Sequence, residues 1–331
     1  MERLLVIDFK DDPEFVSVEP QYFDDPFNGK GIRIIRYRKD KKVDVFWERG
    51  VTLDFESFNI GDGLGACMEV DFIRKGFSIN SSGVQLDIAF LDDKLRLNKL
   101  FIKEPPPSLK RFPFLAPVGH NITDPKQFFL AYMPDFDFVK TSAEVKFYIE
   151  HRVMHPKKFV LTRDFKSVYF MRYAATTAIC QMNPPFESIP VLNGCPNTVE
   201  THNDMQISFD GDGNVSTIAA SFKNAVCKAS FVPSLPNCRL MKDGEKFTGR
   251  FFIDIQGVRI TGGECTFAMN NSRVNVCYDV TDSWIPQDLP LSFKLFTKVA
   301  SFFRKWPSTY IWSGCVNTQT HKLISSVWRR K

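Results

Sequence analysis

The side chains best suited to chemistry lie close together in the second quarter of the chain. They are an imidazole, a phenol and two carboxyl groups, from His120, Tyr132, Asp135 and Asp137. A carboxyl group beside phenylalanine rings is desolvated, which raises its pKa and prepares it to act as a general acid. The spacing therefore predicts an acid–base site. The alternative is that Asp135 and Asp137 are solvated turn residues and that His120 lies on the surface.

Aromatic residues near predicted strand ends and loops, with one neighbouring carboxylate, are candidate contacts for an apolar ligand. The set consists of Trp47, Glu48, Phe112, Phe114 and Trp284. The chain holds 33 Phe but only 8 Tyr, and each buried ring removes about 150–250 Å² from water. This composition favours a phenylalanine-rich interior or a lined cavity. The simpler alternative is that the rings only fill a core.

Motifs for other kinds of chemistry are missing from the sequence. The eight cysteines form no Cys-x-x-Cys pair, and none has a histidine beside it at ligand spacing. We therefore expect no metal site and no cofactor. The sequence also contains no Gly-x-Ser-x-Gly elbow, so an ordinary hydrolase triad has no support.

A period-two alternation of apolar residues predicts that the chain is all-β. Residues 84–90 and 274–280 alternate between apolar and polar or small side chains, and the pattern recurs at 145–149 and 251–255. Such alternation is typical of strands with one buried face. Because it appears in two distant parts of the chain, we expect each part to build its own closed or sandwiched sheet, and the preferred interpretation is two closed sheets, each with a dry lumen.

The length of the chain favours two domains. At 331 residues it exceeds the roughly 250–300 residues at which a single core usually stops growing. We expect one domain over residues 1–180 and a second over 197–331, joined by a proline-containing connection over 181–204. The proline-rich segment 104–121 is predicted to be a long ordered loop, because proline removes amide donors from a central strand.

One amphipathic helix is predicted near residues 291–306, within a basic C-terminal segment. Its apolar side chains follow the 3.6-residue period, and Pro307 ends it. Residues 289–331 carry eight Lys or Arg and no Asp or Glu. Two roles stay open: the helix packs on the second sheet, or residues 289–331 make a peripheral contact with an anionic membrane.

Charge and hydropathy also limit the classes of partner. Outside residues 289–331 the acidic residues outnumber the basic ones, so no general nucleic-acid surface is expected. The apolar run at 4–7 is too short for a signal sequence and is followed by Asp8, which favours a cytoplasmic protein.

Several short motifs resemble the tandem lipocalin-like proteins of the calycin type that are grouped with AttH and the carotenoid hydratases. The motifs are residues 27–31 leading into 32–37, the hairpin through Phe46 and Trp47, the segment 112–119, and Trp306-Pro307 with Tyr310 and Trp312. The resemblance implies two tandem lipocalin-like antiparallel β-barrels with one C-terminal amphipathic helix. It also implies an apolar ligand in a barrel or between barrels and, in some members, hydration, cyclisation or isomerisation of a polyene or terpenoid.

Three functions remain open at this point. The first is binding or carriage of a small hydrophobic molecule, such as an isoprenoid, a terpenoid or a fatty acid, which an eight-stranded barrel can hold. The second is a lyase, isomerase or cyclase that uses the acid–base residues. The third is a structural or membrane-peripheral β protein whose sheets have solid cores.

Overall fold

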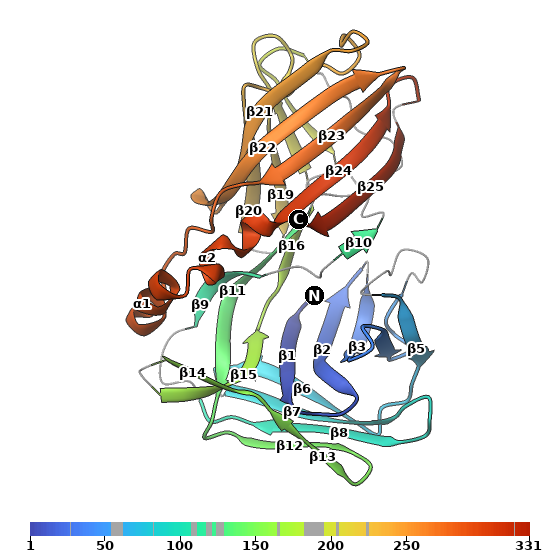
Figure 1. The fold of residues 1–331 in the computed structure, drawn as a ribbon, viewed down its shortest axis with the longest axis vertical. Helices are drawn as coiled ribbons and strands as arrows, with labels where there is room; N and C mark the ends of the chain where they lie inside the picture. The colour runs from blue at the N-terminus through green and yellow to red at the C-terminus, as the bar shows by residue number, and fades with distance from the viewer. Residues whose placement is uncertain are drawn as a thin grey trace. The chain divides into compact units, whose positions relative to one another are not determined.

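The structure is a computed structural model of the chain. It describes all residues except 27, 54–61, 82, 107–110, 117–120, 124–128, 164–165, 182–194, 203–204, 223–224 and 321. The chain is mostly β, as predicted, and the strands in its described part form two sheets (Figure 1). Two compact units divide it. Unit 1 comprises Met1–Phe114, Tyr132–Thr177 and Gln287–Val299, and unit 2 comprises Leu115–Ala131, Ala178–Pro286 and Ala300–Lys331.

A 15-stranded sheet contains most of the strands of the first half of the chain. Its strands are β1 (Arg3–Lys10), β2 (Phe15–Asp25), β3 (Gly29–Arg38), β4 (Val43–Trp47), β5 (Leu64–Glu69), β6 (Arg74–Asn80), β7 (Gly83–Leu91), β8 (Leu97–Lys103), β9 (Phe112–Ala116), β11 (Phe129–Lys140), β12 (Glu144–Ile149), β13 (Arg152–Pro156), β14 (Lys158–Arg163), β15 (Lys166–Ala174) and β16 (Ala178–Gln181).

A 10-stranded antiparallel sheet contains the strands of the second half and one short strand from the first. Its strands are β10 (Asn121–Thr123), β17 (Val199–His202), β18 (Met205–Phe209), β19 (Val215–Phe222), β20 (Ala225–Val232), β21 (Lys246–Ile255), β22 (Val258–Asn270), β23 (Arg273–Val280), β24 (Tyr310–Asn317) and β25 (Lys322–Arg330).

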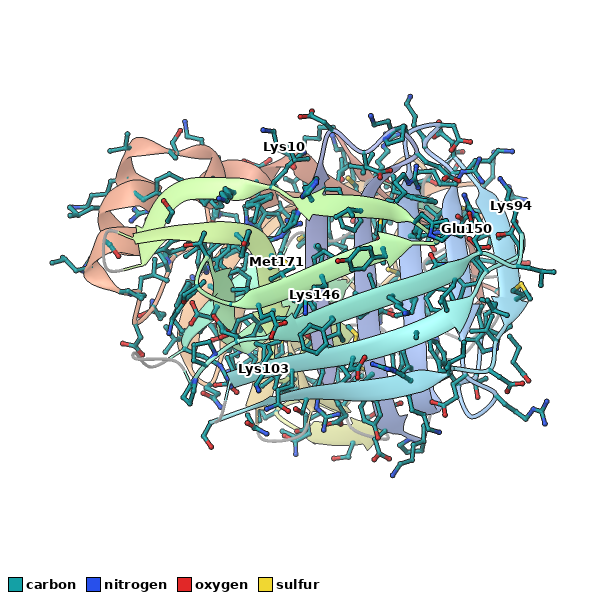
Figure 2. The ribbon with its side chains drawn as sticks, turned by 90° about the horizontal axis from the view of Figure 1, so that it is seen from below. Lys10, Lys94, Lys103, Lys146, Glu150 and Met171 are labelled. Carbon is teal, nitrogen blue, oxygen red and sulfur yellow. The ribbon has the colours of Figure 1, made fainter. Side chains whose placement is uncertain are left out.

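The 15-stranded sheet forms two layers within unit 1, and strand β1 pairs with a strand of each layer. Its first part, Leu4–Ile7, pairs with β15, whereas Phe9 and Lys10 pair with β13. Layer 1 contains β5, β4, β3, β2, β1, β15, β11 and β14, and layer 2 contains β6, β7, β8, β12 and β13. Figure 2 shows the strands of layer 2 crossing those of layer 1 at a steep angle. The sheet is therefore a curled half-barrel rather than a closed barrel.

The space between the two layers is filled by side chains. Leu5, Ile32 and Phe46 from layer 1 belong to the same buried cluster as Ile88 and Phe147 from layer 2. The predicted alternation in β7 is confirmed, since Val84, Leu86 and Ile88 are buried and Gln85 is exposed. This packed core takes the place of the predicted dry lumen in unit 1. Alternation of apolar residues indicates only that a strand has one buried face. Strands of a sandwich have such a face, and so do strands of a barrel.

The 10-stranded sheet of unit 2 is a meander of neighbouring antiparallel strands from β17 to β25, with β10 added beside β25. Its path ends at β17 and at β10, so it is an open sheet instead of the predicted closed barrel. Phe251 and Ile253 are buried on one face, and the rings of Phe251 and Trp312 lie 5.4 and 5.7 Å from that of Tyr278.

The proline-rich segment contains a strand where a loop was predicted. Strand β9 includes Pro113 and pairs with β11. β11 is its single partner among the described pairs, and a strand with one neighbour tolerates proline, because the missing amide donor can face away from the ladder.

The predicted helix is broken into three short pieces: α1 (Leu291–Val299), α2 (Phe302–Lys305) and the 3₁₀ helix η1 (Trp306–Thr309). Pro307 lies inside η1 rather than after the helix. α1 belongs to unit 1, although its sequence position had assigned it to the second predicted domain. Within the described residues, no helix is long and apolar enough to cross a membrane.

Candidate functional site

The predicted acid–base residues are spread along one strand instead of a loop. Tyr132, Asp135 and Asp137 all lie in β11. Asp135 is exposed, whereas Asp137 is buried and accepts a hydrogen bond from the backbone N–H of Phe138 at 2.9 Å. His120 lies outside the described residues. The structure therefore places the two carboxyl groups in different surroundings, and the site of all four residues stays a prediction.

The predicted ligand contacts at the end of β4 point in different directions. The indole of Trp47 is buried among the apolar residues of layer 1. Glu48 accepts a hydrogen bond from the N–H of Ile32 at 3.2 Å and pairs with Lys75 at 2.8 Å. Glu48 is therefore already occupied by contacts within the protein.

The other predicted aromatic contacts are buried. The rings of Phe112 and Phe114 pack on the ring of Phe136 at 5.4 and 4.3 Å, and Phe293 of α1 lies 5.0 Å from Phe112. Trp284 lies in unit 2 and is buried, and its backbone N–H donates to the backbone carbonyl of Arg304 at 2.8 Å.

A different set of polar residues lies together on layer 1, on the face turned away from layer 2. We call this set the polar centre; it consists of Asp8, Glu19, Gln21, Arg33, Tyr37 and Arg172, from strands β1, β2, β3 and β15. Because side chains alternate across a strand, Val18 and Ile34 enter the core while Glu19 and Arg33 take this outer face. The polar centre is thus a product of strand register.

Hydrogen bonds connect the members of the polar centre. Glu19 accepts from the amide of Gln21 at 2.6 Å and from the hydroxyl of Tyr37 at 3.3 Å. The Nε–H of Arg33 donates to Gln21 Oε1 at 2.7 Å, and Arg172 forms an ion pair with Asp8. The buried Nε of Arg172 has no hydrogen-bond partner among the described residues. Two positive and two negative side chains therefore share this face.

Apolar clusters flank the polar centre on both sides. On one side lie Phe23, Ile35, Val43, Val45, Trp47 and Val51. On the other lie Phe112, Phe114, Phe136, Phe138, Phe159, Phe170, Phe293 and Phe296, linked by ring contacts. Arg33 stacks on Phe23 at 4.5 Å, and Arg172 stacks on Phe170 at 4.6 Å. Each arginine thus joins the polar centre to one apolar cluster.

Burial controls the protonation of this site. Desolvation raises the pKa of Glu19, and the hydrogen bond from Gln21 and the charge of Arg33 only partly oppose it. Desolvation also raises the pKa of Asp8 against the charge of Arg172, and it raises that of Tyr37 well above its ordinary value. Burial lowers the pKa of Arg33 to about 10. At neutral pH, Tyr37 is therefore a hydroxyl donor, Arg33 is charged, and Glu19 takes up a proton more readily than a free carboxylate.

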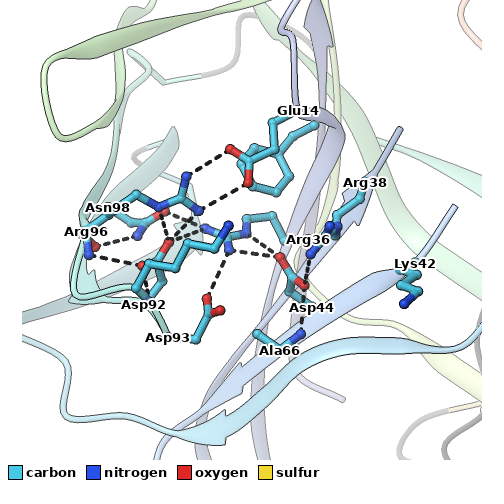
Figure 3. A network of polar contacts seen from close by, with 12 residues as sticks. Glu14, Arg36, Arg38, Lys42, Asp44, Ala66, Asp92, Asp93, Arg96 and Asn98 are labelled. Carbon is cyan, nitrogen blue, oxygen red and sulfur yellow. Dashed lines mark hydrogen bonds and ion pairs between the residues drawn. The ribbon is translucent and has the colours of Figure 1, made fainter. Parts of the chain in front are cut away.

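A second charged cluster lies between the layers and is fully paired (Figure 3). The guanidinium of Arg36 donates to Asp44 at 2.8 Å, to Asp92 at 3.1 Å and to Asn98 at 2.8 Å. Asp44 also accepts from the N–H of Ala66 at 2.9 Å. Neighbouring Gly65 leaves room for this carboxylate, since a Cβ there would lie 2.3 Å from Asp44 Oδ1. Such a satisfied buried network is a structural clamp rather than a site for a ligand.

No family model, curated protein or solved structure matches this chain.

The polar centre was missed at the sequence level because strand β2 was not predicted. A signal was present, since Val18, Pro20 and Tyr22 alternate with Ser17, Glu19 and Gln21. The pairing that brings Glu19 beside Ile35 and Gln21 beside Arg33 depends on register, which the sequence alone does not specify.

Proposed function

We propose that unit 1 binds a small hydrophobic molecule, such as an isoprenoid, a terpenoid or a fatty acid, with its polar end at the polar centre. The observation that carries this proposal is the stacking of Arg33 on Phe23 and of Arg172 on Phe170, which places charged donors at the border of two apolar clusters. Binding sites for small molecules commonly combine an apolar lining with a few convergent polar groups.

The solvent exposure of the polar centre supports the same proposal. Glu19, Arg33 and Tyr37 are only half-buried, yet desolvation is the largest influence on the pKa of each. Protein atoms therefore surround these groups, and part of each side chain is still exposed to a polar head group. Because side chains fill the space between the layers, we place the ligand on this outer face and not in the interior of a barrel.

The apolar clusters and the polar centre would contribute to binding in different ways. Burial of the apolar body would supply most of the affinity, at about 25 cal/mol per Å². The arginines and Tyr37 would fix the polar end by charge-assisted hydrogen bonds, which select molecules with a carboxylate or hydroxyl head.

The tandem lipocalin-like resemblance belongs to this proposal. The antiparallel meander of unit 2 from β17 to β25 supports it, because calycin-type barrels are built from consecutive antiparallel strands.

A second candidate function is acid–base catalysis on a polyene or terpenoid, as a lyase, isomerase or cyclase. It is favoured by the raised pKa of Glu19 and by the Tyr37 hydroxyl that donates to it. A carboxyl group whose pKa is raised keeps its proton to a higher pH than a free carboxyl group and can donate it to a double bond as a general acid. Glu19 takes the place that the sequence had given to Asp135 and Asp137.

Fluorescence titration of the full chain tests the binding proposal. The probes are a fluorescent polyene fatty acid and a hydrocarbon of similar length without a head group. The Arg33→Gln, Arg172→Gln double variant is expected to bind the fatty acid at least about tenfold more weakly, since a hydrogen bond to a charged group is worth about 1.5–3 kcal/mol. Its affinity for the hydrocarbon should hardly change.

Two controls accompany this titration. Arg74→Gln, which removes an exposed arginine paired with Asp87, should bind both probes as the wild type does. Equal loss of both probes in the double variant would mean that the arginines support the fold and not the head group. For the enzymatic candidate, Glu19→Gln should abolish turnover of a bound polyene while leaving its binding in place.

A further inference from the structure

Helix α1 has two apolar sides, and only one of them is covered. Ser292, Phe293 and Thr297 are buried, and Phe293 and Phe296 pack on rings of unit 1. On the other side, Leu291, Leu295 and Val299 are exposed by 69%, 49% and 88%. At a spacing of four residues these three side chains form one stripe along the helix.

Positive charge borders this stripe. Lys294 and Lys298 are exposed, and the helical period places them next to each other and beside Leu291 and Leu295. α1 contains no Asp or Glu. The free half of the helix therefore carries aliphatic side chains on one flank and ammonium groups on the other.

We propose that this free half of α1 docks on an anionic lipid surface. A helix that lies in the plane of a membrane needs an apolar face that enters the headgroup region and lysines that meet the lipid phosphates and carboxylates. Leu291, Leu295 and Val299 supply the first, and Lys294 and Lys298 supply the second.

The size of the surface favours lipid over a protein partner. A stable protein interface buries about 800 Å² on each partner, whereas a nine-residue helix is only about 13 Å long. One side of such a helix offers too little area for a stable complex. It is enough for weak, reversible attachment, in which short-range burial and electrostatic attraction add together.

Vesicle flotation of the full chain tests this inference. The probes are vesicles of phosphatidylcholine alone and vesicles that contain phosphatidylserine as about a third of the lipid. The wild type should float with the anionic vesicles and much less with the neutral ones, and binding should weaken with added salt. Lys294→Gln with Lys298→Gln should lower partition about thirtyfold, because each lysine near such a surface contributes about fivefold.

The apolar stripe is tested by a triple variant, Leu291→Ser, Leu295→Ser and Val299→Ser, which should abolish flotation. Its matched control changes three other exposed aliphatic residues, Ile73, Leu95 and Leu240, to serine. The control for the lysines is Lys99→Gln with Lys103→Gln on layer 2. Both controls should float as the wild type does, and all variants should keep the wild-type melting temperature.

Several results would overturn the inference. They are failure of the wild type to float, equal flotation with neutral and anionic vesicles, and equal flotation of the wild type and the triple serine variant. A dimer in sedimentation velocity that the triple serine variant dissolves would assign the stripe to a second copy of the chain instead of lipid.

Discussion

Arg36 on β3 and Asp92 after β7 form a buried ion pair, with Arg36 Nη1 3.1 Å from Asp92 Oδ2, although 56 residues separate them in the chain (Figure 3). Their side chains are 3% and 0% exposed. Because β3 belongs to layer 1 and β7 to layer 2, the pair ties the two layers of unit 1 together.

Removing one partner of this pair should strongly destabilise unit 1. Arg36→Met leaves Asp92 and Asp44 buried without the guanidinium, and loss of one partner of a buried pair costs about 3–5 kcal/mol. Urea denaturation followed by circular dichroism measures this change. Arg74→Met, which breaks an exposed pair with Asp87, should cost at most about 1 kcal/mol. Similar losses in the two variants would show that the buried pair is no clamp.

The clamp should also make stability depend on acid pH. Burial raises the pKa of Asp92, but hydrogen bonds from Arg96 and Arg36 outweigh it and hold the pKa below its ordinary 3.8. A lowered carboxyl pKa contributes stability that is present above the unfolded value and is lost as the pH falls through the folded value. The free energy of unfolding should therefore fall below about pH 4. Asp92→Asn should show a shallower fall, and an unchanged slope would contradict the assignment.

Glu19 should behave in the opposite way. Its pKa is raised by desolvation, so the folded protein binds a proton there more tightly than the unfolded chain does. This group should make the protein more stable as the pH falls from above its folded pKa toward 4.5. Glu19→Gln should remove that rise and increase the free energy of unfolding at pH 7, as measured by urea titration across pH 4–8. A loss of stability at pH 7 would show that the ionised form is favoured in the fold.

Phe293 should be the residue that holds α1 on unit 1. It is buried, and its ring lies 5.0 Å from Phe112 and 6.0 Å from Phe138. Phe293→Ala should cost about 3–5 kcal/mol if the site does not collapse. It should also increase hydrogen exchange in α1 more than in the strands. Leu295→Ala, on the exposed side of α1, is the matched control and should leave hydrogen exchange in α1 unchanged. Faster exchange in both variants would contradict the inference that Phe293 holds the helix on unit 1.

Strand positions were largely predictable because alternation is a local property. The pattern at residues 84–90 gives β7, and those at 251–255 and 274–280 fall within β21 and β23. The curl of the 15-stranded sheet was not predictable, because it depends on where β1 changes partner between Ile7 and Phe9.

The candidate site was harder to predict from the sequence than the strands were. Glu19 and Arg172 are 153 positions apart, and only the register of β2, β1 and β15 brings them to one face. Burial of polar groups and long-range pairing leave no pattern in a single sequence.

Native mass spectrometry of the full chain, purified from its own source, tests the central proposal most directly. The account predicts that the wild type carries a small apolar molecule that an organic solvent extracts. It also predicts that Arg33→Gln with Arg172→Gln carries much less of this molecule, while Arg74→Gln carries as much. A wild-type protein without a bound molecule, or equal loading of wild type and double variant, would contradict ligand binding at the polar centre.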